Sequence, residues 1–231
     1  MTCSPSDNHV PRSVATRAQL IAGAGVALSV TAVVVPGVFP LASAGVAIAG
    51  IVLYFPRASR AARAGAAAEA RVAAVLAGLG SRHEIITNRV IPGLKGRAPE
   101  ADVIVARADA VFVVEVKHSI CPVVLRGSGM ECVPDRGPRY TLRDPRPQVV
   151  EQVRSVRRFL ADWGIDVPVY AVVVVLAPQL TIQGGIDLPV FASADAVRGM
   201  IESTRPPGGR GGDPRVALAR LPGRDRVRSR P

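Results

Sequence analysis

The amino-acid sequence predicts an α/β domain with a mixed sheet flanked by helices, preceded by a helical hairpin in the membrane. Helix-like and strand-like patterns alternate over residues 64–203 in the order helix, three strands, helix, strand, helix. The β-branched run at residues 167–178 is typical of a strand covered on both faces. With 48% apolar and 20% charged residues, the chain is neither a disordered protein nor a collagen-like fibre.

The first element is a stretch of 39 residues without charge, residues 18–56. As one helix it would extend about 58 Å, roughly twice the thickness of the hydrocarbon core of a bilayer. Pro36, Gly37 and Pro40 interrupt it near the middle, where proline ends a helix and glycine permits a turn. We therefore expect two short helices, residues 18–35 and 41–56, that form a membrane hairpin, with a shallow re-entrant hairpin as the alternative because each arm is short for a full span.

Arginines flank this apolar stretch on both sides, and such cations stay on the cytoplasmic side of a membrane. The sequence thus predicts a cytoplasmic N-terminus (1–17), a two-helix hairpin that makes the chain a multi-pass protein of the cell membrane (18–56), and a cytoplasmic domain (57–204). The competing interpretation is a secretory signal cleaved after residues 42–44. The flanking arginines are Arg12, Arg17, Arg57, Arg60 and Arg63.

The net charge of +11 is unevenly distributed along the chain. Residues 64–202 carry about +1 and residues 203–231 carry +6, so the total does not indicate a nucleic-acid-binding face on the folded part. We expect residues 205–231 to form a disordered, arginine-rich tail. Cys121 and Cys132 are expected as free thiols, with a bridge between them as the alternative for an exported domain.

Two carboxylates are expected to meet in the hairpin formed by residues 101–119. A tight turn at residues 107–110 sets a register in which Asp102 lies directly opposite Glu115. Lys117 shares a face with Glu115, because side chains alternate along a strand. Like charges facing one another need a cation, so a divalent ion between the carboxylates is one interpretation. The other is a Glu115–Lys117 ion pair on a solvated face, with Asp102 capping a strand end.

Glu69 lies in the alanine-rich helix predicted for residues 64–80. It precedes Val72 by three residues, so it continues the apolar stripe of the helix and points toward the core. A buried carboxylate needs a cation, a metal or hydrogen bonds. Equally, Glu69 can be stabilised by the free amides and the dipole at the helix start.

Gln148 and Gln152 flank the buried stripe of the helix predicted for residues 144–164. Gln148 lies near the helix start, where its amide can hold a metal-bound water or a phosphate oxygen, or can be an ordinary boundary residue. Gln152 is expected to be an ordinary boundary residue. Three arginines on the other side of this helix can contact phosphates or form a solvated face: Arg154, Arg157 and Arg158.

Together, the segments AGAAAEARV, PEADVIV, FVVEVKHS, DPRPQ and VPVYAVVVV resemble the nuclease-related domain (NERD), a branch of the PD-(D/E)XK nuclease superfamily, over residues 64–202. The resemblance implies a restriction-endonuclease-like fold and Mg²⁺ (or Mn²⁺) as cofactor. It also implies roles for five residues: Asp102 and Glu115 as metal ligands, Lys117 as the group that orients or activates water, Glu69 as an assistant at the metal, and Gln148 as a support from the helix.

These observations lead to two hypotheses of different class. The first is a membrane-anchored, metal-dependent nuclease that hydrolyses phosphodiester bonds in DNA at the cytoplasmic face. The second is a catalytically inactive module of the same fold, held at the lipid bilayer, whose arginine-rich tail contacts nucleic acid or anionic lipid.

Overall fold

The computed structural model of the chain describes residues 62–92, 98–127, 129–207 and 211–223. The chain divides into two compact units, Met1–Ala64 and Gly65–Pro231, and the second contains all the strands that the structure describes. The predicted membrane hairpin, residues 18–56, lies outside the described residues. Among those that are described, no helix is both long enough and apolar enough to cross a bilayer.

A five-stranded mixed sheet forms the centre of the second unit, with the strand order β1-β2-β3-β7-β9. β1, β2 and β3 pair antiparallel, whereas β3 pairs parallel with β7 and β7 pairs parallel with β9. β3 and β7 are covered on both sides, as their runs of valine predict. The strands are β1 (His83–Val90), β2 (Glu100–Arg107), β3 (Ala110–His118), β7 (Val169–Leu176) and β9 (Val190–Phe191).

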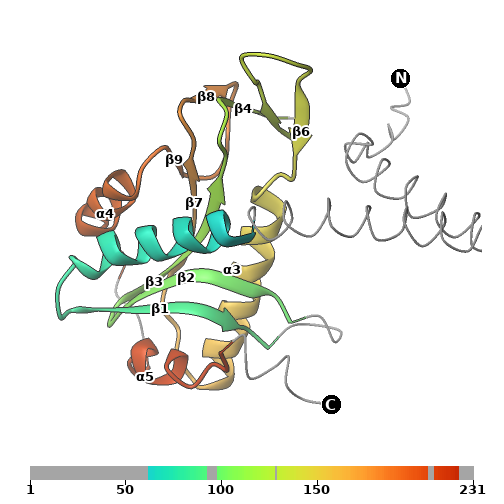
Figure 1. Cartoon of the computed structure of the whole chain (residues 1–231). Helices are drawn as coiled ribbons and strands as arrows, with labels where there is room; N and C mark the ends of the chain where they lie inside the picture. Colours follow the sequence, from blue (N-terminus) through green and yellow to red (C-terminus); the bar gives the residue numbers. More distant parts are fainter. Residues whose placement is uncertain (1–61, 93–97, 128, 208–210, 224–231) are drawn as a thin grey trace, which may run out of the picture. The chain divides into compact units, whose positions relative to one another are not determined.

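Helices cover both faces of this sheet (Figure 1). The helix at residues 62–77 and α4 (Ala194–Ser203) pack on one face, where Val72 and Ile201 belong to the same buried cluster as Phe112. On the other face, α3 (Arg146–Asp162) and α5 (Pro214–Leu218) contribute to a second buried cluster with Val113. The predicted mixed α/β architecture is therefore confirmed, and it fits a nuclease-like fold.

A smaller sheet, with the order β6-β5-β4-β8, follows the C-terminal end of β3. The sequence analysis did not predict this second sheet, because β6 is only 3 residues long and β8 pairs with β4, which is distant in the sequence. Leu125 packs into the same core as α3, which attaches this sheet to the rest of the domain. Its strands are β4 (Val123–Arg126), β5 (Gly129–Cys132), β6 (Tyr140–Leu142) and β8 (Leu180–Gln183).

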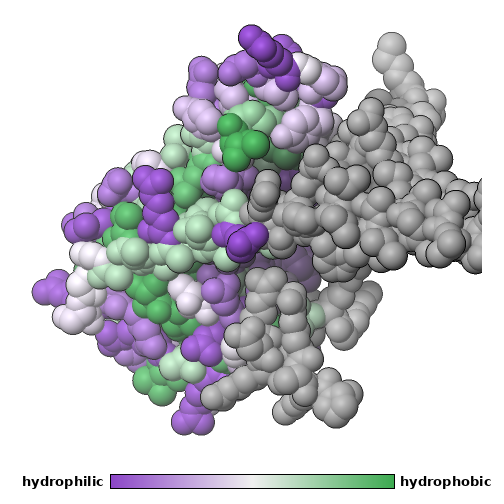
Figure 2. Space-filling model, in the orientation of Figure 1, coloured by the Kyte–Doolittle hydropathy of each residue, from purple (hydrophilic) through white to green (hydrophobic). Residues whose placement is uncertain are grey.

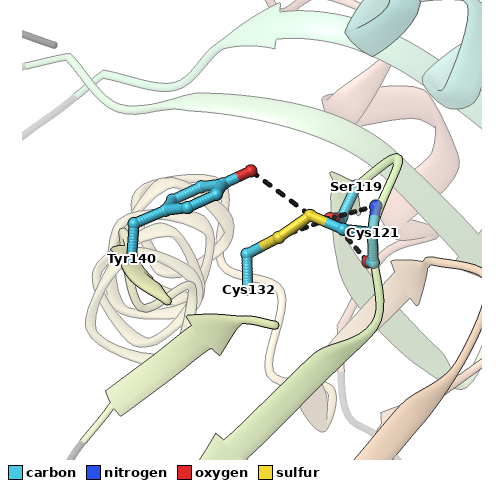
Figure 3. The surroundings of a disulfide bond; sticks show 4 residues. All are labelled: Ser119, Cys121, Cys132 and Tyr140. Carbon is cyan, nitrogen blue, oxygen red and sulfur yellow. Dashed lines mark hydrogen bonds between the residues drawn. A yellow bond between two sulfur atoms is a disulfide. The ribbon is translucent and has the colours of Figure 1, made fainter. Parts of the chain in front are cut away.

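A disulfide between Cys121 and Cys132 ties the start of β4 to the end of β5 (Figure 3). Val123 and Cys132 are register partners, so the hairpin brings the two cysteines close together. The hydroxyl of Ser119 donates to the backbone oxygen of Cys121, and the hydroxyl of Tyr140 lies 3.3 Å from its sulfur. The expectation of free thiols is wrong for this pair in the structure.

The C-terminal segment folds where disorder was expected. Residues 211–223 include α5, and Leu218 and Leu221 are buried in the core against α3 and β2. Asp213 caps the helix by accepting the backbone N–H of Arg215 at 3.0 Å. The prediction of a disordered tail over residues 205–231 is therefore wrong for residues 211–223, because two leucines offset the polarity of their neighbours by packing into the sheet.

Candidate functional site

The predicted hairpin register is confirmed by the pairing of β2 with β3. Arg107 pairs with Ala110 at the turn, and Val103 pairs with Val114 at the other end of the ladder. Asp102 and Glu115 are the next residues on each strand. Beyond them, β3 continues beside β7, where Lys117 pairs with Val175. The two carboxylates therefore sit where the hairpin ladder ends, on the central strands of the sheet.

Glu115 is completely buried (0% exposed) and carries three hydrogen bonds. Its Oε1 accepts from Nζ of Lys117 at 2.5 Å. Its Oε2 accepts from Nε2 of Gln148 at 2.8 Å and from Nε2 of Gln152 at 2.7 Å. The Glu115–Lys117 ion pair of the alternative interpretation thus exists, but on a buried face rather than a solvated one, and burying a carboxylate is costly without such partners.

Asp102 caps a strand end, as the second of the two sequence interpretations expected. Its Oδ2 accepts the backbone N–H of Val116 at 2.8 Å, so it caps the end of the ladder. Burial, followed by the negative charge of Glu115, raises the pKa of Asp102 from 3.8 to about 7. The hydrogen bond from Val116 opposes this increase in pKa. The two carboxylates are close enough for each charge to disfavour the other.

Glu69 reaches the same site from the helix at residues 62–77. It is half-buried beside Ala68, which is in the core, and its charge also raises the pKa of Asp102. The charge of Lys117 acts in the opposite direction and lowers that pKa. Three acidic side chains and one ammonium group therefore act on one another at this end of the sheet, and the negative charge exceeds the positive charge.

The two glutamines come from the N-terminal half of α3, one turn apart. Gln148 accepts from Nζ of Lys117 at 3.4 Å while it donates to Glu115, so it contacts both members of the ion pair. Gln152 donates to the backbone oxygen of Glu100 at 2.7 Å as well as to Glu115, and it is completely buried. The expectation that Gln152 is an ordinary boundary residue is wrong, because it holds the buried carboxylate in place.

Asn88 on β1 occupies an unusual backbone conformation next to this site. Its φ of 51° is left-handed, and among the described residues no other residue except glycine has a positive φ. The neighbouring pairs Thr87–Val103 and Arg89–Ala101 place Asn88 beside Asp102 in the register, and the ladder is interrupted between these two residues. No pattern in the sequence distinguishes Asn88 from other strand residues.

The three arginines of α3, for which the sequence left phosphate contact or a solvated face open, lie along the solvent side of the helix. Nη1 of Arg154 is 3.9 Å from the carboxylate of Glu151, and Nη2 of Arg157 donates to the backbone oxygen of Val169 at 2.9 Å. Arg158 is exposed. Arg157 also lines a surface hollow at the C-terminal end of α3, the end opposite Gln148. The structure does not bring these arginines to the carboxylates.

The donor set of the site suits a hard divalent cation. Asp102 and Glu115 supply carboxylate oxygens, which are the ligands that Mg²⁺ and Mn²⁺ prefer. The acidic neighbours that help to raise the pKa of Asp102 leave a surplus of negative charge, which a cation offsets. Within the part of the chain that the structure describes, no three His, Cys, Asp or Glu side chains are grouped closely enough to form a metal site by themselves.

Comparison with known protein families identifies the region that contains this site. A family model, the nuclease-related domain, matches residues 64–176. The match covers Glu69, both carboxylates, Lys117 and both glutamines. Comparison with curated proteins and with solved structures gave no match. Residues 64–176 of this chain are therefore a nuclease-related domain, as the sequence pattern predicted.

Proposed function

We propose that this domain hydrolyses phosphodiester bonds in nucleic acid with the help of a divalent metal ion, and that its substrate is DNA. The observation that carries the proposal is the surroundings of Glu115. A fully buried carboxylate is held by an ammonium group and two amides beside a second carboxylate whose pKa is raised. Burying charged groups costs folding stability, and carboxylates with perturbed pKa values gather at functional sites.

In this proposal Asp102 and Glu115 hold Mg²⁺ or Mn²⁺, which supplies a water of lowered pKa and offsets charge on the phosphate. The two glutamines keep the carboxylate of Glu115 in one orientation, since each donates to the same oxygen. The side chain of Lys117 is 25% exposed, so its ammonium group faces both Glu115 and solvent. That position suits it to contact a non-bridging phosphate oxygen or to orient the attacking water.

We also propose that residues 18–56 anchor the domain at the cytoplasmic face of the cell membrane. The support is the uncharged stretch with arginines on both flanks, because the positive-inside rule then leaves both ends of the hairpin in the cytoplasm. Fusion of a topology reporter to the C-terminus of the full chain tests this placement. Reporter activity characteristic of the opposite side of the membrane contradicts it and supports the exported domain, the alternative for which a Cys121–Cys132 bridge was expected.

A nuclease assay tests the proposed reaction. The purified full-length protein should cleave DNA in the presence of Mg²⁺ or Mn²⁺ and lose that cleavage in EDTA. Asp102→Asn and Glu115→Gln keep the shape of each side chain and remove its charge, so both should abolish cleavage. Asp135→Asn is the matched control, because Asp135 is an exposed acid in the loop between β5 and β6 and should be dispensable. Equal cleavage by all three variants contradicts the proposal.

The inactive module remains the second candidate, and one observation favours it. Both oxygens of Glu115 are already occupied by Lys117 and the glutamines, an arrangement that is satisfied without any metal. Calorimetric titration of Mn²⁺ separates the two candidates. A nuclease should bind Mn²⁺ and lose that binding in Glu115→Gln, whereas an inactive module should show no metal binding in either protein.

A further inference from the structure

Three exposed arginines stand together on the second sheet, on the loop before β6 and at the two ends of that strand. Arg136, Arg139 and Arg143 are exposed, and none of them makes a hydrogen bond or an ion pair with the described residues. We refer to these three residues as the β6 arginine patch. Guanidinium groups without partners on a protein surface are available to an external anion.

Neighbouring arginines of the same region are engaged, which sets the patch apart. Arg126 is bonded to Gln183 at 2.8 Å and to Glu131, and Arg146 is bonded to Asp144 at 2.6 Å. Among the described arginines, three others have exposed guanidinium groups without a partner, and they are scattered over separate elements: Arg71, Arg82 and Arg158. Three unpaired guanidinium groups within eight residues therefore form a local positive surface that the low net charge of the domain conceals.

The alternation of side chains along β6 places the arginines at its two ends on the outer face of the second sheet. The hydroxyl of Tyr140 lies by the disulfide, and Leu142 packs against the core, so these two side chains lie on the face of the sheet that holds the disulfide. By alternation, Arg139 and Arg143 point to the opposite side. Four residues of extended chain span about 13 Å, a length over which one strand of B-DNA presents about four phosphates. In Figure 2, hydrophilic residues gather at the top of the view, where Figure 1 shows the loop before β6.

The patch is followed in the chain by α3, the helix that supplies two glutamines to the candidate site. Arg143 follows β6, and α3 starts three residues later at Arg146. Gln148, in the first turn of α3, contacts both Glu115 and Lys117. A phosphate chain lying along β6 thus runs toward the N-terminal end of α3, which carries Gln148. We propose that the β6 arginine patch binds the phosphate backbone of the nucleic acid and directs the strand to the site, an inference that rests on the proposed function.

Binding measured without cleavage tests this inference separately from the reaction. The full-length protein is titrated in EDTA into a fluorescein-labelled, single-stranded DNA of about 20 nucleotides, and anisotropy is recorded between about 50 and 200 mM salt. Replacing the three patch residues by glutamine should weaken binding at least about tenfold and reduce the slope of log affinity against log salt by about 2, since each contact to a single strand contributes about 0.7. The matching lysine variant should retain most of the affinity.

Two control proteins make the result specific. Arg82→Gln removes an equally exposed, unpaired guanidinium group that precedes β1 at the turn end of the sheet, and it should leave binding unchanged. The triple glutamine variant of Arg154, Arg157 and Arg158 should also bind as the wild type does. If the α3 variant loses affinity and the patch variant does not, the inference is overturned.

Anionic lipid is the competing ligand for a basic patch near a membrane. Vesicles containing phosphatidylserine are therefore titrated in parallel. Loss of vesicle binding in the patch variant, with DNA binding intact, overturns the inference. If the patch variant loses DNA binding while the wild type never cleaves DNA, the proposed reaction fails and the interface remains. If the wild type cleaves DNA and the patch variant binds DNA with the salt slope of the wild type, the proposed reaction stands and the inference about the patch is overturned.

Discussion

The pKa of Asp102 predicts how the stability of the domain changes with pH. In the folded protein this pKa is raised from 3.8 to about 7, so the folded state binds the proton more tightly than the unfolded state does. The stability that this group contributes is complete below about pH 4 and is lost as the pH rises to about 7. This increase in the pKa of Asp102 corresponds to about 4 kcal/mol of folding free energy. About 3 kcal/mol of that stability is lost as the pH rises above about 5.

Asp102→Asn should remove this pH dependence. An asparagine side chain keeps an oxygen that can accept the N–H of Val116 but has no proton to lose. Urea unfolding in EDTA at about pH 5 and about pH 8 measures the effect, and the fluorescence of Trp163, the single tryptophan, reports on it. We expect the variant to be more stable than the wild type at the higher pH by about 3 to 4 kcal/mol.

A divalent ion should reverse that order of stability. Mn²⁺ at the higher pH should stabilise the wild type, because it binds the folded state and offsets the charge of both carboxylates, and it should have little effect on Asp102→Asn. Asp135→Asn should keep the pH slope of the wild type, since Asp135 is exposed. If Asp102→Asn shows the same slope as the wild type, burial and the charge of Glu115 do not act on Asp102 as described.

Three further predictions concern the surroundings of the site. Lys117→Met should destabilise the metal-free protein by about 3 to 5 kcal/mol in urea unfolding, because it leaves the buried charge of Glu115 without its cation, and adding Glu115→Gln should recover most of that loss. Asn88→Ala should lower the free energy of unfolding by about 1 to 2 kcal/mol, whereas Asn88→Gly should leave it almost unchanged, because the left-handed φ disfavours alanine. Equal losses in the two variants would contradict a strained backbone at Asn88. Mass spectrometry after thiol blocking should find Cys121 linked to Cys132 in the purified protein, and reduction of this link, which joins residues 11 positions apart, should lower stability by about 3 kcal/mol.

The sequence predicted the centre of the site well because a tight hairpin leaves little freedom. Once the turn at residues 107–110 was placed, the opposition of Asp102 and Glu115 followed from the register. Gln152 was missed for a physical reason. A glutamine on the margin of an apolar helix stripe looks the same in sequence whether solvent or a buried carboxylate lies opposite, and only the packing of α3 on β3 decides between them.

Elements that depend on distant pairing were also beyond prediction. β8 and β9 are short strands that are stabilised by parallel partners far away in the sequence. For α5 a signal was present, since Asp213 and Pro214 form the same Asp-Pro helix start that located α3 at Asp144. The surrounding glycines and arginines outweighed that signal. Average charge likewise concealed the β6 arginine patch, because a net value does not show which arginines are paired.

The return of residues 221–223 to β1 has a practical consequence for any truncated protein. The backbone N–H of Val90 donates to Pro222 at 3.1 Å, and Nη1 of Arg89 donates to Leu221 at 3.0 Å. These late residues shield part of the outer edge of a peripheral strand, which would otherwise invite pairing with another molecule. A shortened version ending near residue 205 would uncover that edge and remove two core leucines. Poor solubility of such a fragment would then reflect the missing cover rather than any defect in the residues of the candidate site.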